Sequence, residues 1–132
     1  MLNIAVVENN GRVLMRKKPD GSPPYKETWY LFGGEVADGT SPEEATRKII
    51  KTQAGLDVKL RDNIGWDVEI KDDLDGEKKQ FIYLDSTYDY IGGDILIGEN
   101  IEKVEWVPID KLHEYDIVPP SKILFKKLGY IG

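Results

Sequence analysis

The chain has 132 residues, of which 40% are hydrophobic and 10% aromatic, and it carries a formal net charge of −6 at pH 7. This size and composition are typical of one globular domain with its own core, so we expect a single domain over residues 1–132. No apolar run approaches the ~20 residues that a membrane-spanning helix needs, and the acidic balance argues against a nucleic-acid-binding protein. The absence of cysteine excludes disulfides and thiolate chemistry and is compatible with the cytoplasmic location that we expect.

The front of the chain is predicted to form a β-hairpin followed by an aromatic strand. The turn signal is Asn9-Asn10-Gly11, whose residues tolerate the positive φ of a tight hairpin. The expected elements are a strand over 3–7, the turn over 9–11, a strand over 12–16, a Pro- and Gly-rich loop over 18–28, and a strand over 29–32 that runs into Gly33-Gly34.

The segment after the glycine pair has the signals of an amphipathic helix. Ser41 is a favourable N-cap, Pro42 takes the first helical position, and Glu44 follows three residues after the cap. Gly55 supplies the C-cap. Between these ends, apolar residues recur on one face at helical spacing, at Ala45, Ile49, Ile50 and Ala54.

The second half of the chain is predicted to contain a long hairpin, a short strand and a helix. The expected elements are strands over 58–72 and 79–86 joined by a turn at 73–76, a loop over 91–100, a strand over 104–107, one helical turn over 109–112, and a helix after Pro119-Pro120. In that helix we expect Ser121 to be the cap and Ile123, Leu124 and Leu128 to face inward. The pattern predicts the α/β (α+β) class, with a mixed β-sheet packed between helices.

Over nearly the whole chain this order of elements resembles the Nudix hydrolase family (MutT-like). The family's motif is a glycine, five residues, Glu, seven residues, Arg-Glu, an aliphatic residue, any residue, Glu-Glu, any residue, glycine and an aliphatic residue. Gly34 and Gly55 fix its register here without an insertion, the aliphatic positions are Ile50 and Leu56, and Lys48 replaces the arginine. The four glutamates are replaced by Thr40, Ile49, Thr52 and Gln53.

The replaced positions carry the family's chemistry. As the resemblance implies, Nudix hydrolases cleave a diphosphate linkage by water attack, with Mg²⁺ or Mn²⁺ held by the helical carboxylates. Positions 49, 52 and 53 share one helix face, where three acids would make the oxygen-rich site that Mg²⁺ prefers. Ile49 offers no oxygen, and Thr52 and Gln53 offer neutral ones. We therefore expect a degenerate motif with no metal ligand, no metal cofactor and no standard Nudix hydrolysis.

Acids elsewhere in the sequence are weak candidates for a replacement catalytic set. They are Glu44, one turn before Lys48, and Glu99 and Glu102, in the loop before the last strand. Acids in a first helical turn are favoured by the helix dipole in any protein, and loop acids are usually surface charges. His113, the only histidine, is also more typical of a surface residue than of a catalytic one.

The scaffold keeps features that suit an anionic ligand. Backbone N–H groups around a glycine pair and a helix N-terminus favour phosphate, and basic side chains nearby would add positive charge. The candidate ligand-binding residues are Arg16, Gly33, Gly34, Lys48, Thr52 and Gln53. The cluster 16–18 would attract a phosphate, although such a run is more often a solvated strand end. Candidates for stacking on a base, each also explained by core packing, are Tyr25, Trp29, Tyr30, Trp66, Phe81 and Tyr83.

Three hypotheses remain open at the level of the sequence. The first is a Nudix-fold protein without metal chemistry that binds a nucleotide-like phosphorylated ligand. The second is an active pyrophosphohydrolase of nucleoside diphosphate derivatives, which would use non-standard acids with Mg²⁺ or Mn²⁺. The third is a protein-interaction scaffold. None of them involves nucleic acid or a membrane, and the oligomeric state is left open.

Overall fold

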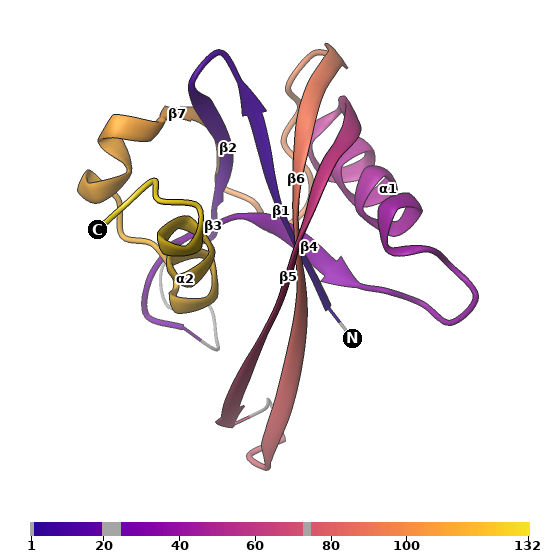
Figure 1. Ribbon diagram of the computed structural model, residues 1–132, viewed down its shortest axis with the longest axis vertical. Helices are drawn as coiled ribbons and strands as arrows, with labels where there is room; N and C mark the ends of the chain where they lie inside the picture. Colours follow the sequence, from indigo (N-terminus) through magenta and orange to yellow (C-terminus); the bar gives the residue numbers. More distant parts are fainter. Residues whose placement is uncertain (1, 20–24, 73–74) are drawn as a thin grey trace.

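The computed structural model describes residues 2–19, 25–72 and 75–132. They form a seven-stranded mixed sheet with the helices α1 and α2 on opposite faces (Figure 1), which confirms the expected class. The elements are β1 (Leu2–Asn9), β2 (Arg12–Lys17), β3 (Trp29–Tyr30), β4 (Phe32–Glu35), α1 (Pro42–Ala54), β5 (Leu56–Asp72), β6 (Lys78–Gly93), β7 (Lys103–Pro108), the 3₁₀ helix η1 (Ile109–Glu114) and α2 (Pro119–Lys127).

Strand β1 lies at the centre of the sheet and is buried on both faces. It pairs in parallel with β6 and antiparallel with β4. Because side chains alternate along a strand, Ile4 and Val6 join a cluster under α2, whereas Ala5 and Val7 join one under α1. The uninterrupted apolar run in the sequence is the pattern expected of a strand covered on both sides.

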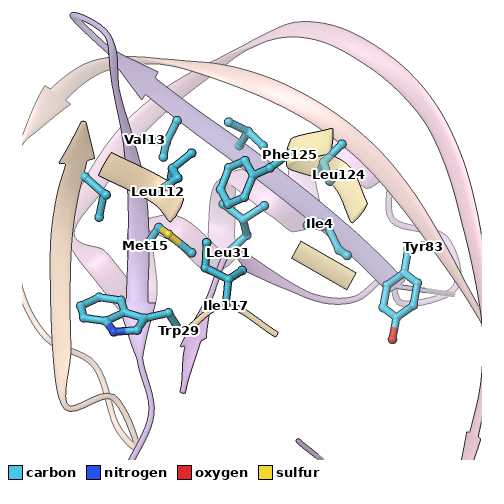
Figure 2. Close-up of a cluster of buried hydrophobic side chains, with 12 residues drawn as sticks. Ile4, Val13, Met15, Trp29, Leu31, Tyr83, Leu112, Ile117, Leu124 and Phe125 are labelled. Atoms are coloured by element: carbon cyan, nitrogen blue, oxygen red, sulfur yellow. The ribbon is translucent and has the colours of Figure 1, made fainter. Parts of the chain in front are cut away.

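The cluster under α2 is the larger of the two. Figure 2 shows Trp29 at one end of it and Tyr83 at the other, with the Tyr83 hydroxyl pointing away from the cluster. Leu124 and Phe125 of α2 are fully buried within it. The hydroxyl of Tyr83 is thereby free to take part in a polar site at the edge of the core.

Helix α1 begins and ends as predicted. The Ser41 hydroxyl accepts a hydrogen bond from Glu44 N at 3.1 Å. Gly55 has a φ of 76°, and its N–H donates to Lys51 O at 3.0 Å, as expected of a left-handed C-cap. The residues that the helix buries are Ala45, Thr46, Ile50 and Ala54.

Helix α2 begins earlier than expected, and Ser121 is not its cap. Pro119 and Pro120 are its first two residues and Val118 is the N-cap, because proline fits the first turn of a helix. Ser121 is buried inside the helix, where its hydroxyl accepts from Leu31 N at 3.0 Å. It fastens α2 to the sheet between β3 and β4, so the prediction of a capping role was wrong.

The inward face of α2 also differs at one residue. Ile123, expected to face inward, is 46% exposed, and Phe125 contributes to the core instead. Leu124 is fully buried and Leu128 packs partly against the same cluster, as predicted. The earlier start of the helix changes which residues meet the sheet.

The strands are longer and more divided than the sequence indicates. Residues 91–93, expected in a loop, extend β6 because they pair with the start of β5. The aromatic strand over 29–32 divides at Leu31, where the chain leaves β2 and begins to pair with β1. Residues 20–24 of the expected loop and 73–74 of the expected turn lie outside the described residues. No helix in the described ranges is long and apolar enough to cross a membrane.

Candidate functional site

The glycine pair after β4 lets α1 and β1 approach closely. A Cβ at Gly33 would lie 2.0 Å from Asn3 O, so the backbone of β1 excludes any side chain there. A Cβ at Gly34 would lie 2.9 Å from Ile49 Cδ1. The side chain of Ile49 therefore occupies the space directly over Gly34, where the family's motif has a glutamate.

Arg16 reaches from β2 to the end of α1. Its Nη1 donates to Gln53 Oε1 at 2.9 Å and its Nε to Leu31 O at 3.2 Å. The guanidinium lies 5.3 Å from the centroid of the Phe32 ring and 5.8 Å from that of Tyr30. Burial lowers the pKa of Arg16 to about 10, with Tyr30 opposing the shift, so the group stays cationic at neutral pH. A fixed positive charge thus sits beside the C-terminal half of α1.

The other motif positions offer few oxygen donors. Thr52 is exposed and Thr40 half-buried, while the Oε1 of Gln53 already accepts from Arg16. Within the described residues, no three side chains of His, Asp or Glu are placed to hold a metal ion together.

The candidate acids lie apart from one another. Glu44 lines a shallow depression with Lys48, between α1 and β5. Glu102 lies beside β2, with a carboxylate oxygen 3.8 Å from Lys17 Nζ. Glu99 is exposed, but its loop touches α1, since Gly98 N donates to Gln53 O at 3.0 Å. The backbone next to Glu99 therefore lies at the C-terminal end of α1.

Three of the six aromatic candidates gather in one place. Tyr25, Tyr30 and Tyr83 line an apolar cleft of about 130 Å³ next to Gly33 and Gly34, on the side of α2. Trp29, in contrast, packs in the core against Tyr115 with ring centroids 4.9 Å apart. Trp66 is exposed on β5, and Phe81 is half-buried. His113 lines a separate depression near the end of α2.

A hydrogen-bonded network forms the outer wall of this cleft. Lys71 Nζ donates to Tyr25 Oη at 2.6 Å and to Tyr83 Oη at 2.9 Å. Both hydroxyls donate to Glu69 Oε1, at 2.6 and 2.9 Å. Burial alone would lower the pKa of Lys71, but its bonds to Tyr83 and Glu69 outweigh burial and raise it. Lys71 therefore remains a cation that holds two tyrosines in place.

Three cations surround the cleft. Lys18 Nζ lies 4.4 Å from the ring centroid of Tyr30. Burial lowers the pKa of Lys18, and the positive charges of Arg16 and Lys71 lower it further. The hydroxyl of Tyr30 is buried and has no hydrogen-bond partner among the described residues. The cleft thus combines aromatic walls, an unused polar atom and a positive rim.

Sequence reasoning identified Arg16 and the glycine pair but missed the role of Lys71. Lys71 lies in an alternating strand where nothing distinguishes it from a solvent-facing charge. The basic cluster 16–18 indicated a patch that would attract phosphate. In the structure its side chains have different neighbours, with Lys17 near Glu102 and Lys18 near Tyr30. Lys48 and Thr52 are exposed on α1, and Lys48 lies in the separate depression with Glu44.

Comparison with known proteins supports the resemblance. The NUDIX domain family matches residues 2–128 of the chain. The nucleoside triphosphatase NudI of Enterobacter sp. (strain 638) is 24% identical over 132 residues, covering 96% of this chain and 94% of the relative. The nucleoside triphosphatase NudI of Salmonella typhimurium is 29% identical over 118 residues, covering 85% and 84%.

Solved structures show the same fold. A NUDIX hydrolase from Nitrosomonas europaea has a TM-score of 0.75 at 13% identity, covering 97% of this chain and 86% of the other. The MutT protein of Methanosarcina mazei has a TM-score of 0.72 at 19% identity, covering 97% and 91%. An ADP-ribose pyrophosphatase from Streptococcus suis has a TM-score of 0.70 at 17% identity, covering 98% and 86%. From the family match over residues 2–128, together with this fold, the chain belongs to the NUDIX family.

Proposed function

We propose that this chain binds a nucleotide-like phosphorylated ligand and does not carry out the metal-dependent hydrolysis for which its family is known. The observation that supports this most directly is the contact between Arg16 and Gln53. In the family's motif the position of Gln53 is a glutamate that faces a metal ion. In this chain it is a neutral amide bound to a guanidinium.

The residues present do not fit a divalent cation. Mg²⁺ is bound through carboxylates and substrate phosphates with near-octahedral oxygen geometry, and Ile49 brings an alkyl group to this face instead. A divalent ion about 4 Å from the Arg16 guanidinium would meet roughly 8 kcal/mol of repulsion at the effective dielectric of a protein surface. We infer that the guanidinium takes over part of the positive charge that a metal would supply.

The tyrosine-lined cleft and its rim suit the two halves of a nucleotide. A base can stack on Tyr25, Tyr30 or Tyr83, and its polar edge can bond the unpartnered Tyr30 hydroxyl. Phosphates would meet Arg16 and Lys18, because guanidinium groups bind phosphate oxygens with two parallel hydrogen bonds. The names of the NudI relatives suggest a nucleoside triphosphate as the first ligand class to test.

An active pyrophosphohydrolase is the second candidate. The contact between the loop of Glu99 and the end of α1 favours it, since Glu99 follows Gly98, whose N–H donates to Gln53 O at 3.0 Å. A single acid gives one charged ligand, so this candidate would need the substrate's own phosphates to complete a metal site.

Thermal unfolding with nucleoside triphosphates separates the two candidates. We expect the same stabilisation in Mg²⁺ and in EDTA, about 2.7 kcal/mol at a ligand concentration of 100 times Kd, with no phosphate released. Phosphate release that requires Mg²⁺ and stops in EDTA would overturn the proposal and favour the enzyme. An absence of any stabilisation by nucleotides would also overturn it.

A further inference from the structure

Strands β5 and β6 continue past both helices as a two-stranded ribbon (Figure 1). Side chains alternate between the two faces of a strand, so every second residue lies on the same face. On one face of the ribbon the cross-strand pairs form four successive rungs, Trp66–Leu84, Val68–Ile82, Ile70–Gln80 and Asp72–Lys78. We call these eight residues the ribbon face.

The ribbon face is apolar and open to solvent. Ile70 is 71% exposed, Trp66 64%, Val68 44% and Ile82 37%. Single exposed apolar residues are normal, but a contiguous group is typical of an interaction surface. The opposite face of the ribbon is covered by its own chain, since Lys71 and Tyr83 bond Tyr25 there.

A hollow of about 430 Å³ lies at the inner end of the ribbon face, beside the first turn of α1. Its walls include Trp66 and Leu84 of the first rung, together with Glu43, Asp85 and Asn3. Asn3 is 3% exposed, and its Oδ1 atom has no hydrogen-bond partner among the described residues. A buried acceptor of this kind favours a donor or a cation from outside the chain. Asp85 differs, because its carboxylate already bonds Lys127 Nζ at 2.9 Å. The described lining contains two acids and neither Lys nor Arg.

We propose that the ribbon face binds the ribbon face of a second copy of this chain, with the two ribbons antiparallel. A two-fold axis between the second and third rungs then makes the surface self-complementary. The second rung of one copy meets the third rung of the other, which stacks Val68 on Ile70 in both directions. The fourth rung of one copy meets the first rung of the other, so Lys78 arrives over Leu84 and beside the acidic hollow.

Two features of the chain select this occupant and this orientation. Rungs two residues apart are separated by ~6.7 Å, so the first and fourth lie ~20 Å apart, and the fourth rung of one ribbon reaches the hollow of the other. Lys78 then supplies a cation beside Glu43, in a hollow whose described lining holds neither Lys nor Arg. A parallel arrangement is excluded because α1 stands on this face beyond the first rung, as its Glu43 in the hollow shows, and two such helices would collide.

Sedimentation velocity over a range of protein concentrations tests the proposal. We expect a dimer of the 15.0 kDa chain. In Ile70→Lys we expect the dissociation constant of the dimer to rise by at least ~100-fold, because a two-fold symmetric interface contains each substituted residue twice. Ile91→Lys, a residue that is 59% exposed at the other end of β6, is the control and should dimerise normally. A wild-type monomer at every concentration, or a dimer unchanged by Ile70→Lys in a variant that melts like the wild type, would overturn the proposal.

A charge exchange tests the orientation. Lys78→Glu and Glu43→Lys should each weaken the dimer, and the double variant should recover most of the loss because the opposite charges meet again. The dimer constants of the four proteins give the coupling between the two residues directly. Losses that simply add in the double variant would overturn the antiparallel arrangement.

Discussion

Arg16 belongs to β2 and Gln53 to α1, and their side chains meet although 37 residues separate them. The sequence indicates each as a candidate for ligand binding, but it does not indicate that they bind one another. The contact depends on Gly34 and Ile49, which set how closely α1 lies on the sheet. A guanidinium in this place is permanent and monovalent, whereas a metal ion is divalent and exchangeable, and the two favour different chemistry.

Replacing Arg16 should therefore weaken ligand binding more than it weakens the fold. Hydrogen bonds to charged groups contribute about 1.5–3 kcal/mol, so we expect Arg16→Met to raise the Kd of a nucleoside triphosphate by about 10–150-fold. Arg12→Met, on the same strand but exposed, is the matched control. Calorimetric titration in EDTA measures both, and equal effects of the two variants would remove Arg16 from the site.

Restoring the carboxylates should restore a metal site. In a variant with Glu at positions 49, 52 and 53 and Met at position 16, three acids share one helix face and the competing cation is gone. We expect Mn²⁺ binding detectable by electron paramagnetic resonance, with none in the wild type. The matched control carries Gln at 49 and 52, keeps Gln53 and has the same Met. Mn²⁺ bound equally by the control or the wild type would contradict the role assigned to these positions.

Asp85 makes stability depend on pH. Burial raises its pKa to about 7 from an ordinary 3.8, with Asp67 adding to the shift and Lys127, 2.9 Å away, opposing it. The pKa of Asp85 is higher in the folded state than in the unfolded state. At any pH between these two values, the folded state therefore holds a proton that the unfolded chain has lost. The contribution of Asp85 to stability is thus fully present below pH ~4 and is lost as the pH rises towards 7.

We therefore expect Asp85→Asn to flatten the fall in melting temperature of the wild type between pH 5 and pH 8. Asp67 does not cancel this effect. Burial opposes the shift of its pKa, but its bonds to Asp85 and Lys127 lower the pKa, so its own pH dependence lies at more acidic pH. Asp75→Asn, at a fully exposed residue, is the control. An unchanged pH profile in Asp85→Asn would show that another group is responsible.

At the scale of elements, the sequence predicts best what local chemistry determines. The start and end of α1 follow from Ser41, Pro42 and Gly55, and the β1–β2 turn follows from Asn10 and Gly11, which have φ values of 51° and 75°. Features that depend on residues far away in the sequence cannot be predicted from the local pattern. The strand beginning at Trp29 changes partner at Leu31, and Ser121 bonds the sheet instead of capping α2, because tertiary contacts decide both.

Gly55 illustrates how one element is joined to the next. A Cβ there would lie 2.6 Å from Asp94 O, in addition to the strain of a φ of 76°. Gly39 has a similar φ of 80° but nothing within 4 Å of its Cβ position, so Gly39→Ala measures the backbone strain alone. We expect Gly39→Ala to lower the free energy of unfolding by about 1 kcal/mol and Gly55→Ala by ~3 kcal/mol or more. Urea unfolding measures the free energy of unfolding of both variants. Equal losses would mean that the backbone at Asp94 moves away from the new Cβ at no energetic cost.

At the scale of the whole molecule, the two core clusters on opposite faces of the sheet have different roles. The cluster under α1 fixes the helix whose motif face meets Arg16, and the cluster under α2 supports the tyrosine-lined cleft. Strand β1 contributes to both through alternate residues, so neither layer can form without the strand that the other needs. The candidate site lies where the edges of the two layers meet, at Gly33 and Gly34.

This shared strand should make the protein unfold as one unit. Ile50 under α1 and Leu124 under α2 are both fully buried, and they belong to separate clusters. Replacing either with Ala should lower the free energy of unfolding by about 2–5 kcal/mol. Because the sheet separates the two side chains, the losses in the double variant should add to within ~0.5 kcal/mol. In urea, circular dichroism and tryptophan fluorescence should give one midpoint for each variant, since a layer that melted first in Ile50→Ala or Leu124→Ala would separate the two signals.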